Sequence, residues 1–119
     1  MITKRRVMQQ QANGLKSLQD SSGLWHTVVN RSDFYLETSA TALIAYAFKE
    51  GVKHGWLDEL TYTPIANAAM VAVWSQVALD GTVNNVSTST WPMSEDEYNN
   101  LTYHELQLYG QGVGLLAGY

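Results

Sequence analysis

The pattern of hydrophobic and polar positions along the chain predicts four helices separated by polar loops. Over residues 3–18 the apolar residues recur at steps of three or four, as they do on one face of an amphipathic helix. A second helix is expected at 38–54. Its first half is apolar nearly all the way round and rich in alanine, which is typical of a helix buried on most sides. Gly55 is expected to end it in a left-handed conformation.

Start signals predict the other two helices. Thr63 followed by Pro64 indicates a helix that begins there and runs to about Val77, because proline is tolerated at the first helical position. Thr102 and Glu105 have the spacing of a capping box, so the last helix is expected from there to about residue 117. Residues 24–29 alternate and carry β-branched side chains, which predicts a short strand, whereas 82–100 lack helical periodicity and predict a loop.

These elements favour an all-α fold of antiparallel helical hairpins, with short strands in the loops. We find no linker-like stretch, so residues 1–119 are expected to form a single domain. At the level of hairpins, the pattern also fits part of a helical solenoid or an α/α toroid.

Charge and composition narrow the possible partners. Eleven acidic residues against seven basic ones give a formal charge of −4, which argues against nucleic acid because such proteins need a basic footprint. There is no cysteine, so disulfides and thiolate chemistry are excluded. The longest strongly apolar run, 40–48, is about half the length that spans a bilayer, so no membrane association is expected. No signal peptide is visible, and the compartment stays open.

Candidate catalytic and metal-binding patterns are sparse. His26, His54 and His104 are far apart and form no metal-binding motif, so neither a metal site nor a cofactor is predicted. Asp33 and Glu37 are four residues apart, but the chain between them looks extended, and the spacing alone does not indicate a glycosidase pair. Aromatic side chains outside the predicted helices suit a carbohydrate cleft, with packing over helix ends as the alternative; they are Trp25, Tyr35 and Trp91.

Two stretches carry a family resemblance. The segments 18–29, LQDSSGLWHTVV, and 35–42, YLETSATA, resemble a pattern of glycoside hydrolase family 105, the unsaturated rhamnogalacturonyl hydrolases. They match the related family 88 unsaturated glucuronyl hydrolases more loosely. GVKHGWLD at 51–58, and YGQG and LLAG in the last predicted helix, continue the resemblance over essentially the whole chain.

The resemblance implies an (α/α)6 toroid, of which this chain would be the C-terminal third. It also implies enzymes of pectin degradation that act on unsaturated oligosaccharides. Such enzymes protonate the enol-ether double bond of an unsaturated uronyl residue and add water, with one aspartate as general acid and base. No metal or other cofactor is needed.

The chain departs from the family pattern at the residues that perform this chemistry. The family's aspartate lies in the N-terminal half, and its Arg-Gly-Asn-Gly-Trp motif precedes the helix that corresponds to residues 3–18; neither occurs here. We therefore assign no catalytic residue. Trp25, His26 and Tyr109 are the candidates for substrate contact, with structural packing as the alternative for each.

The leading interpretation is the C-terminal portion of such a hydrolase, inactive on its own, with an exposed apolar face along the 38–54 helix that promotes self-association. An alternative is a small non-catalytic helical module that binds a carbohydrate or protein partner through Trp25, Tyr35 and Trp91. A third interpretation is a complete small glycosidase that uses Asp33 and Glu37.

Overall fold

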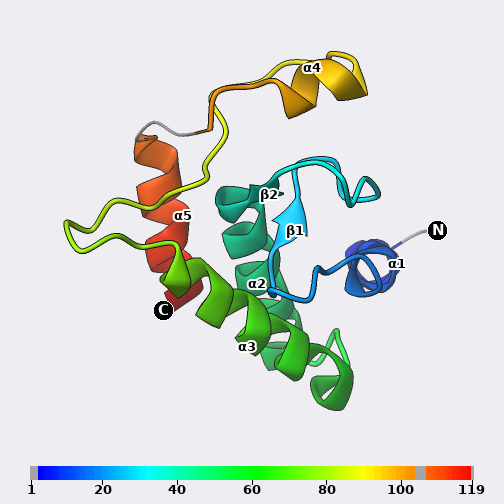
Figure 1. The fold of residues 1–119 in the computed structure, drawn as a ribbon. Coiled ribbons are helices and arrows are strands. Elements are labelled where there is room, and N and C mark those ends of the chain that lie inside the picture. Colours follow the sequence, from blue (N-terminus) through cyan, green and yellow to red (C-terminus); the bar gives the residue numbers. More distant parts are fainter. Residues whose placement is uncertain (1–2, 104–106, 119) are drawn as a thin grey trace.

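The computed structural model describes residues 3–103 and 107–118 of the 119-residue chain (Figure 1). Within them lie five helices: α1 (Lys4–Lys16), α2 (Thr38–Lys53), α3 (Glu59–Ser75), α4 (Glu95–Asn99) and α5 (Leu108–Gly118). Two short strands, β1 (Trp25–His26) and β2 (Leu36–Glu37), pair antiparallel in the loop between α1 and α2. The predicted all-α fold with short strands in the loops is confirmed. No helix of the described part is long and apolar enough to cross a membrane.

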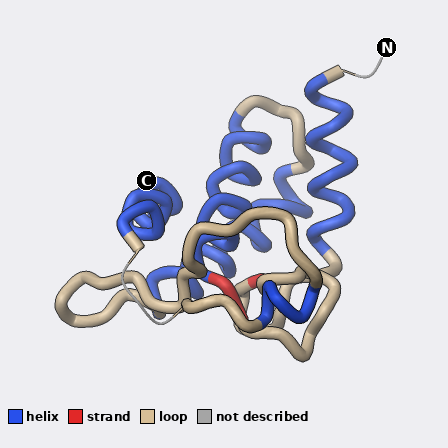
Figure 2. The backbone as a smooth tube through the Cα atoms, turned by 90° about the horizontal axis from the view of Figure 1, so that it is seen from above, coloured by secondary structure: helices blue, strands red, loops and turns tan. Residues whose placement is uncertain are grey.

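Helix α2 is the centre of the packing, as its alanine-rich sequence predicts. It forms an antiparallel hairpin with α3, and α5 runs alongside it in the same direction (Figure 1). Ala42 and Ala45 are fully buried, and their small side chains let the neighbouring helices approach closely. Seen from above, α1 and α5 lie on opposite sides of this central pair (Figure 2).

The main core forms where the strand β1 meets α1, α2 and α3. Trp25 has no exposed surface; its ring meets Phe48 edge-on, and Phe48 meets Tyr62 in the same way, at centroid distances of 6.2 and 5.1 Å. The indole N–H of Trp25 donates to the carbonyl oxygen of Leu15 in α1 at 3.0 Å. Aromatic burial of this kind is among the largest stabilising contributions in a small domain.

The start of the third helix was predicted wrongly. α3 begins four residues earlier than Thr63, at Glu59, because the side chain of Asp58 accepts hydrogen bonds from both the backbone N–H and the hydroxyl of Thr61. Pro64 lies inside the helix. Its missing N–H leaves the carbonyl of Leu60 without a helical partner, and the exposed position of Leu60 allows water to take that place.

The C-terminal third differs from the prediction in two places. The expected loop 82–100 contains α4, whose first turn is closed by a capping box between Ser94 and Glu97. The last helix begins at Leu108 rather than at Thr102, which is not helical. The predicted cap residue Glu105 lies outside the described residues. The predicted strand is also shorter than 24–29, since only Trp25 and His26 pair with β2.

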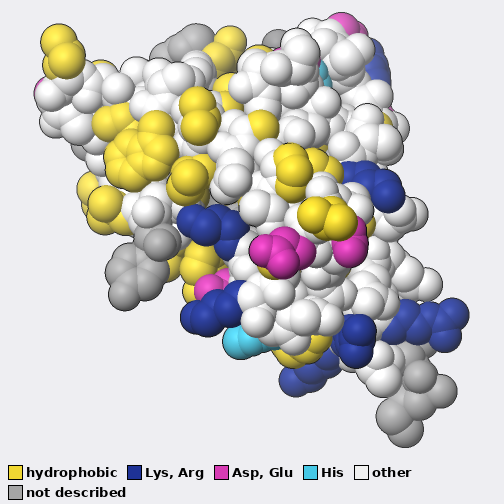
Figure 3. Space-filling view, turned by 90° about the horizontal axis from the view of Figure 1, so that it is seen from below, with side chains coloured by type: hydrophobic (Ala, Val, Ile, Leu, Met, Phe, Trp, Pro, Cys, Tyr) yellow, Lys and Arg dark blue, Asp and Glu magenta, His cyan; other side chains and the backbone are white. Residues whose placement is uncertain are grey.

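The apolar surface lies mostly on other helices than predicted. Neighbouring elements cover much of α2, where Leu43 is the large apolar residue that stays exposed and borders an apolar groove shared with α1. Figure 3 shows hydrophobic side chains gathered on the side of the molecule formed by α5 and the end of α3. The exposed large apolar residues of these two helices are Leu60, Val71, Trp74, Leu108, Tyr109, Leu115 and Leu116.

Gly23, in the loop between α1 and β1, provides a test of the packing. Gly23 has a φ of +95°, and a Cβ there would lie 2.5 Å from the carbonyl oxygen of Ala68 in α3. Gly55 has a φ of +70° but open space around it. We expect Gly55→Ala to cost about 1 kcal/mol from the backbone conformation alone. Gly23→Ala should cost about 2–4 kcal/mol, because it adds overlap with the backbone. Urea unfolding of both variants measures the difference, and equal costs would contradict this packing.

Candidate functional site

A polar concavity lies where the first turns of α2 and α5 meet the segment 87–90. It has a volume of about 420 Å³. Ten residues line it, and eight of them carry hydroxyl groups: Thr27, Ser39, Ser87, Thr88, Ser89, Thr90, Tyr98 and Tyr109. The other two are Glu37 and Ala40. We call this concavity the hydroxyl pocket.

The carboxylate of Glu37 organises the hydroxyl pocket. Glu37 is the N-cap of α2 and is only 4% exposed. Its Oε2 accepts from the backbone N–H of Ala40 at 2.6 Å, and its Oε1 accepts from the hydroxyl of Ser39 at 2.7 Å. The backbone N–H of Ser87, fifty residues away in sequence, also donates to Oε1, at 3.0 Å. One buried carboxylate thus joins the start of α2 to the pocket segment, and its three donors offset the cost of its burial.

Tyr109 brings the first turn of α5 to the same pocket. Partial burial raises the pKa of its phenol above the ordinary value of 10, and the negative charge of Glu37 and the phenol of Tyr35 raise it further. Tyr35 also contacts the pocket segment, since its hydroxyl lies 2.5 Å from the hydroxyl of Ser87. Tyr109, a predicted substrate contact, is therefore partly exposed and faces the hydroxyl pocket.

His26, the second predicted contact, lines a different concavity. A pocket of about 520 Å³ lies between the end of α1 and the loop that follows β1, and His26 and Asp20 are among its lining residues. The Nδ1 of His26 lies 2.6 Å from the carbonyl oxygen of Phe34; because a carbonyl can only accept, Nδ1 carries a proton. Nε2 lies 3.5 Å from the carboxylate of Asp20. Hydrogen bonds from Ser22 lower the pKa of Asp20, and the nearby imidazole adds to this.

The three aromatic residues singled out from the sequence occupy very different environments. Trp25, which was also predicted as a substrate contact, is fully buried and lines neither polar pocket, so it has no surface to offer a ligand here. Tyr35 stacks on Tyr103 with a centroid distance of 3.9 Å and an interplanar angle of 7°. Trp91 is 70% exposed, and its carbonyl accepts from the hydroxyl of the pocket residue Tyr98.

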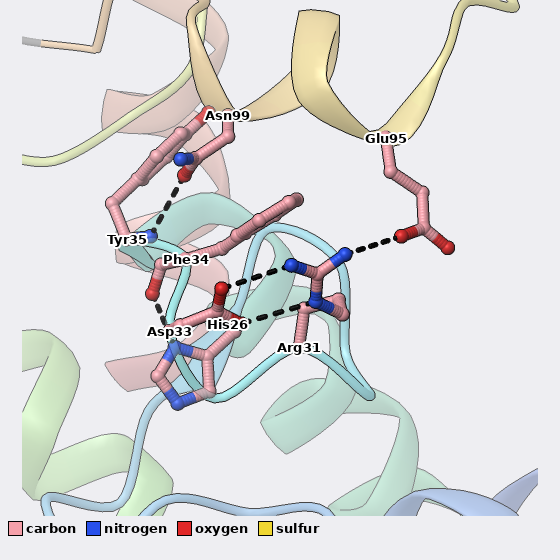
Figure 4. Close-up of polar contacts among 7 residues, drawn as sticks. All are labelled: His26, Arg31, Asp33, Phe34, Tyr35, Glu95 and Asn99. Carbon is pink, nitrogen blue, oxygen red and sulfur yellow. Dashed lines mark hydrogen bonds and ion pairs between the residues drawn. The ribbon is translucent and has the colours of Figure 1, made fainter.

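Asp33 and Glu37 do not share a pocket. Both oxygens of Asp33 accept from the guanidinium of Arg31, at 3.0 and 2.9 Å, and this pairing holds the pKa of Asp33 below its ordinary value (Figure 4). A third nitrogen of Arg31 donates to Glu95 at 2.7 Å and anchors α4 to this loop (Figure 4). A carboxyl kept ionised in this way is a poor general acid, and the structure gives no support to a glycosidase pair.

Metal-ligand geometry is also absent from the described part of the chain. No group of three or more carboxylate or imidazole side chains is placed there to hold an ion. His54, which follows the last residue of α2, lies 3.7 Å from the carboxylate of Glu50, and His104 lies outside the described residues.

Sequence reasoning missed most of the hydroxyl pocket. The run Ser87-Thr88-Ser89-Thr90 was interpreted only as part of a loop, and the side chain of Glu37 was considered only as half of a carboxylate pair with Asp33. The signal was the density of hydroxyl residues at 87–90, but nothing local shows that this run meets the start of α2.

Comparison with known proteins identifies the class of protein. The family model of Glycosyl Hydrolase Family 88 matches residues 3–119, and the chain belongs to this family. It is 38% identical over 109 residues to the unsaturated rhamnogalacturonyl hydrolase YesR of Bacillus subtilis strain 168. That match covers 91% of this chain and 30% of the relative.

Solved structures of related proteins have the same fold as this chain. A possible member of the GH105 family from Salmonella enterica superposes with a TM-score of 0.89 at 29% identity, over 96% of this chain and 31% of that protein. A possible member of the same family from Klebsiella pneumoniae gives 0.87 at 27% identity, over 95% of this chain and 30% of that protein. The chain thus spans about a third of these relatives. The resemblance to family 105 is confirmed, and so is the fold, which is part of an (α/α)6 toroid.

The role of Glu37 can be tested through stability. Glu37→Ala leaves the buried N–H of Ser87 without an acceptor and removes the cap of α2, so we expect a loss of about 3 kcal/mol. Glu50→Ala removes a carboxylate from a partly exposed turn of the same helix and should cost less than about 0.5 kcal/mol. Urea unfolding measures both costs, and amide exchange at Ser87 should accelerate only in the first variant. If the two variants behaved alike, Glu37 would not hold the pocket segment.

The electrostatics of the hydroxyl pocket predict the titration of Tyr109. Its phenol should lose its proton above pH 10, so the stability that it contributes is present below pH 10 and is lost as the pH rises through the raised pKa. Glu37→Gln should lower this pKa but leave it above 10, because burial is the larger cause. Glu97→Gln, which alters the cap of α4, should leave it unchanged. NMR titration of the Tyr109 ring measures its pKa in each protein. If the Glu37→Gln substitution left this pKa unchanged, the carboxylate of Glu37 would not lie close to the phenol.

Proposed function

We propose that this chain is the C-terminal portion of a hydrolase that hydrates the unsaturated uronyl residue of rhamnogalacturonan oligosaccharides. Its role in the toroid is to supply part of the substrate cleft. The observation that carries the proposal is the 38% identity to an unsaturated rhamnogalacturonyl hydrolase. The hydroxyl pocket at the aligned starts of α2 and α5 supports it, because a polar concavity with aromatic walls suits a carbohydrate.

Two of the predicted contact residues fit this role, in different ways. Tyr109 faces the hydroxyl pocket with part of its ring exposed and can stack on a sugar face. His26 borders the neighbouring polar pocket, where the ring nitrogen not bonded to Phe34 can form a hydrogen bond with a sugar hydroxyl. Trp25 acts indirectly: its buried ring and its hydrogen bond to Leu15 hold the strand β1, which contains His26 and is followed by Thr27.

Catalysis is proposed to require residues that this chain does not supply. A general acid for the double bond needs a carboxyl that can carry a proton near neutral pH. Asp33 is held ionised by Arg31, and Glu37 is committed to three hydrogen-bond donors. The resemblance assigns the acid/base aspartate to the N-terminal half of the toroid. We therefore expect the 119-residue chain to be inactive alone.

The apolar sides of α3 and α5 are proposed to contact the rest of the toroid, or a second copy of this chain when the rest is missing. Exposed apolar patches of this kind drive association in water. The sequence predicted self-association through α2; we propose instead the apolar surface of α3 and α5 shown in Figure 3.

A chimeric enzyme tests the proposed function. Residues 3–119 would replace the matching segment of the Bacillus subtilis relative, and hydrolysis of an unsaturated rhamnogalacturonan disaccharide would be followed by loss of double-bond absorbance. We expect the chimera to hydrolyse the disaccharide and the 119-residue chain alone to be inactive. Within the chimera, Tyr109→Ala should lower kcat/KM by roughly tenfold, the value of an aromatic contact. Glu59→Gln, at an exposed position in the first turn of α3, serves as the control and should change it little.

Two outcomes would contradict the proposal. A folded chimera without activity would show that this chain cannot serve in the cleft of such an enzyme. Turnover by the 119-residue chain alone would show that it carries its own acid, and Glu37 and Asp33 would then be tested by substitution. Circular dichroism of each protein distinguishes a loss of function from a failure to fold.

A further inference from the structure

The segment that follows Ser87 leaves the hydroxyl pocket and returns to its starting point. The backbone N–H of Thr88 donates to the carbonyl oxygen of Thr102 at 2.8 Å, so residues 89–101 form a loop whose two ends meet. Its length falls within the range of Ω-loops, which are compact and frequently functional. The loop includes α4, and Tyr98 in that helix lines the hydroxyl pocket. We call residues 89–101 the α4 loop; it supplies one wall of the pocket.

The base of the α4 loop is held more firmly than its body. Just before the base, Ser87 donates its backbone N–H to the buried carboxylate of Glu37 at 3.0 Å. The body buries little, since α4 has no buried residue and Trp91 is largely exposed. In Figure 1, α4 lies beyond the first turns of α2 and α5, outside the packed helices. Segments with few buried contacts have low local stability, so the loop can move about its base while the rest of the chain stays folded.

Two contacts tie α4 to the loop between β1 and β2 (Figure 4). In the first turn of α4, Glu95 accepts from the guanidinium of Arg31 at 2.7 Å. At the last residue of α4, the side-chain oxygen of Asn99 accepts from the backbone N–H of Tyr35 at 3.3 Å. Tyr98 lies between these two points in the helix, so the two contacts together determine the position of its ring in the hydroxyl pocket.

Arg31 is the fixed partner in the shorter of these contacts. Its other two nitrogens donate to Asp33 at 3.0 and 2.9 Å, and its guanidinium lies 4.3 Å from the centre of the buried ring of Phe34. This arrangement holds the guanidinium in place, so one nitrogen is already aimed at Glu95 when the α4 loop closes. Both side chains of the ion pair are partly exposed, so the pair is weak and sensitive to salt. A weak contact with one preorganised partner can open and close readily.

We propose that the α4 loop is a lid on the hydroxyl pocket and that Arg31 is its latch, through the ion pair with Glu95. With the lid closed, Tyr98 completes the wall of the pocket; with the lid open, that wall is lost. Arg31 is therefore a positioning residue, which affects ligand binding without touching the ligand. The motion of the lid is independent of the proposed function, but its effect on substrate binding rests on that function.

Amide exchange of Tyr35 reports the state of the lid in the 119-residue chain. The N–H of Tyr35 belongs to the β1–β2 loop and its acceptor belongs to the lid, so opening of the lid frees this N–H for exchange. Glu95→Gln removes the charge of the latch and should speed this exchange by about two- to fivefold, the value of an exposed ion pair. Raising the salt concentration should speed it in the unsubstituted chain but not in the variant. The amide of Thr27, which donates to the carbonyl of Tyr35 within the same hairpin, should not change.

Asp96→Asn is the matched control. It removes one negative charge from the first turn of α4, as Glu95→Gln does, but it leaves the ion pair with Arg31 intact. Tyr35 exchange should therefore be nearly unchanged. In the chimeric enzyme, Glu95→Gln should raise KM by about two- to fivefold and leave kcat nearly unchanged, because the latch affects the fraction of closed pocket and not the acid. Asp96→Asn should leave both constants nearly unchanged.

The outcomes separate the latch, the lid and the proposed function. Tyr35 exchange that is insensitive to Glu95→Gln or to salt, or that responds equally to Asp96→Asn, would overturn the latch. Faster Tyr35 exchange in the Glu95→Gln variant with an unchanged KM would show that the α4 loop moves without closing the pocket, and would overturn the lid. A folded chimera without activity would reject the proposed function, while the exchange measurements would still decide whether Arg31 holds the α4 loop.

Discussion

The buried carboxylate of Glu37 is the interaction on which the site depends. It lies at the joint between β2 and α2, and it satisfies the N–H group of Ala40 in the first helical turn, which would otherwise lack a partner. The same group accepts the N–H of Ser87, so a segment fifty residues away is fixed against the helix start. Because an ionised carboxylate is costly to bury unpaired, the loss of any one donor weakens the whole joint.

This joint is placed by the packing beneath it. Trp25 pairs with Glu37 in the two-stranded ladder, and the backbone N–H of Trp25 donates to the hydroxyl of Thr41 in α2. The hydroxyl of Thr41 in turn donates to the carbonyl of Glu37. The indole is locked in the apolar core, so the strand, the helix start and the carboxylate form one rigid unit. The fully buried side chain of Trp25 thereby helps to position the hydroxyl pocket.

The sequence predicted the parts of the fold that depend on local pattern, and it failed where distant contacts decide. Helix α2 was predictable because it is rich in alanine and its first half is apolar nearly all the way round. The start of α3 was missed because Thr63-Pro64 imitates a cap, while Asp58 provides the real one. Helix α4 is too short for periodicity to show. Tyr109 apart, the pocket was not predicted, since the contact between Glu37 and Ser87 leaves no trace in either local sequence.

The hydrogen bonds of the Glu37 carboxylate also limit which residue can act as the acid in an enzyme of this fold. Three donors engage the two oxygens of the Glu37 carboxylate, so a proton placed on either oxygen would displace a hydrogen bond in a buried site. The acid that protonates a double bond must instead be free to gain and lose its proton during each turnover. Both demands cannot be met by Glu37. Under the function proposed above, a cleft that keeps Glu37 as its scaffold takes its acid from another segment.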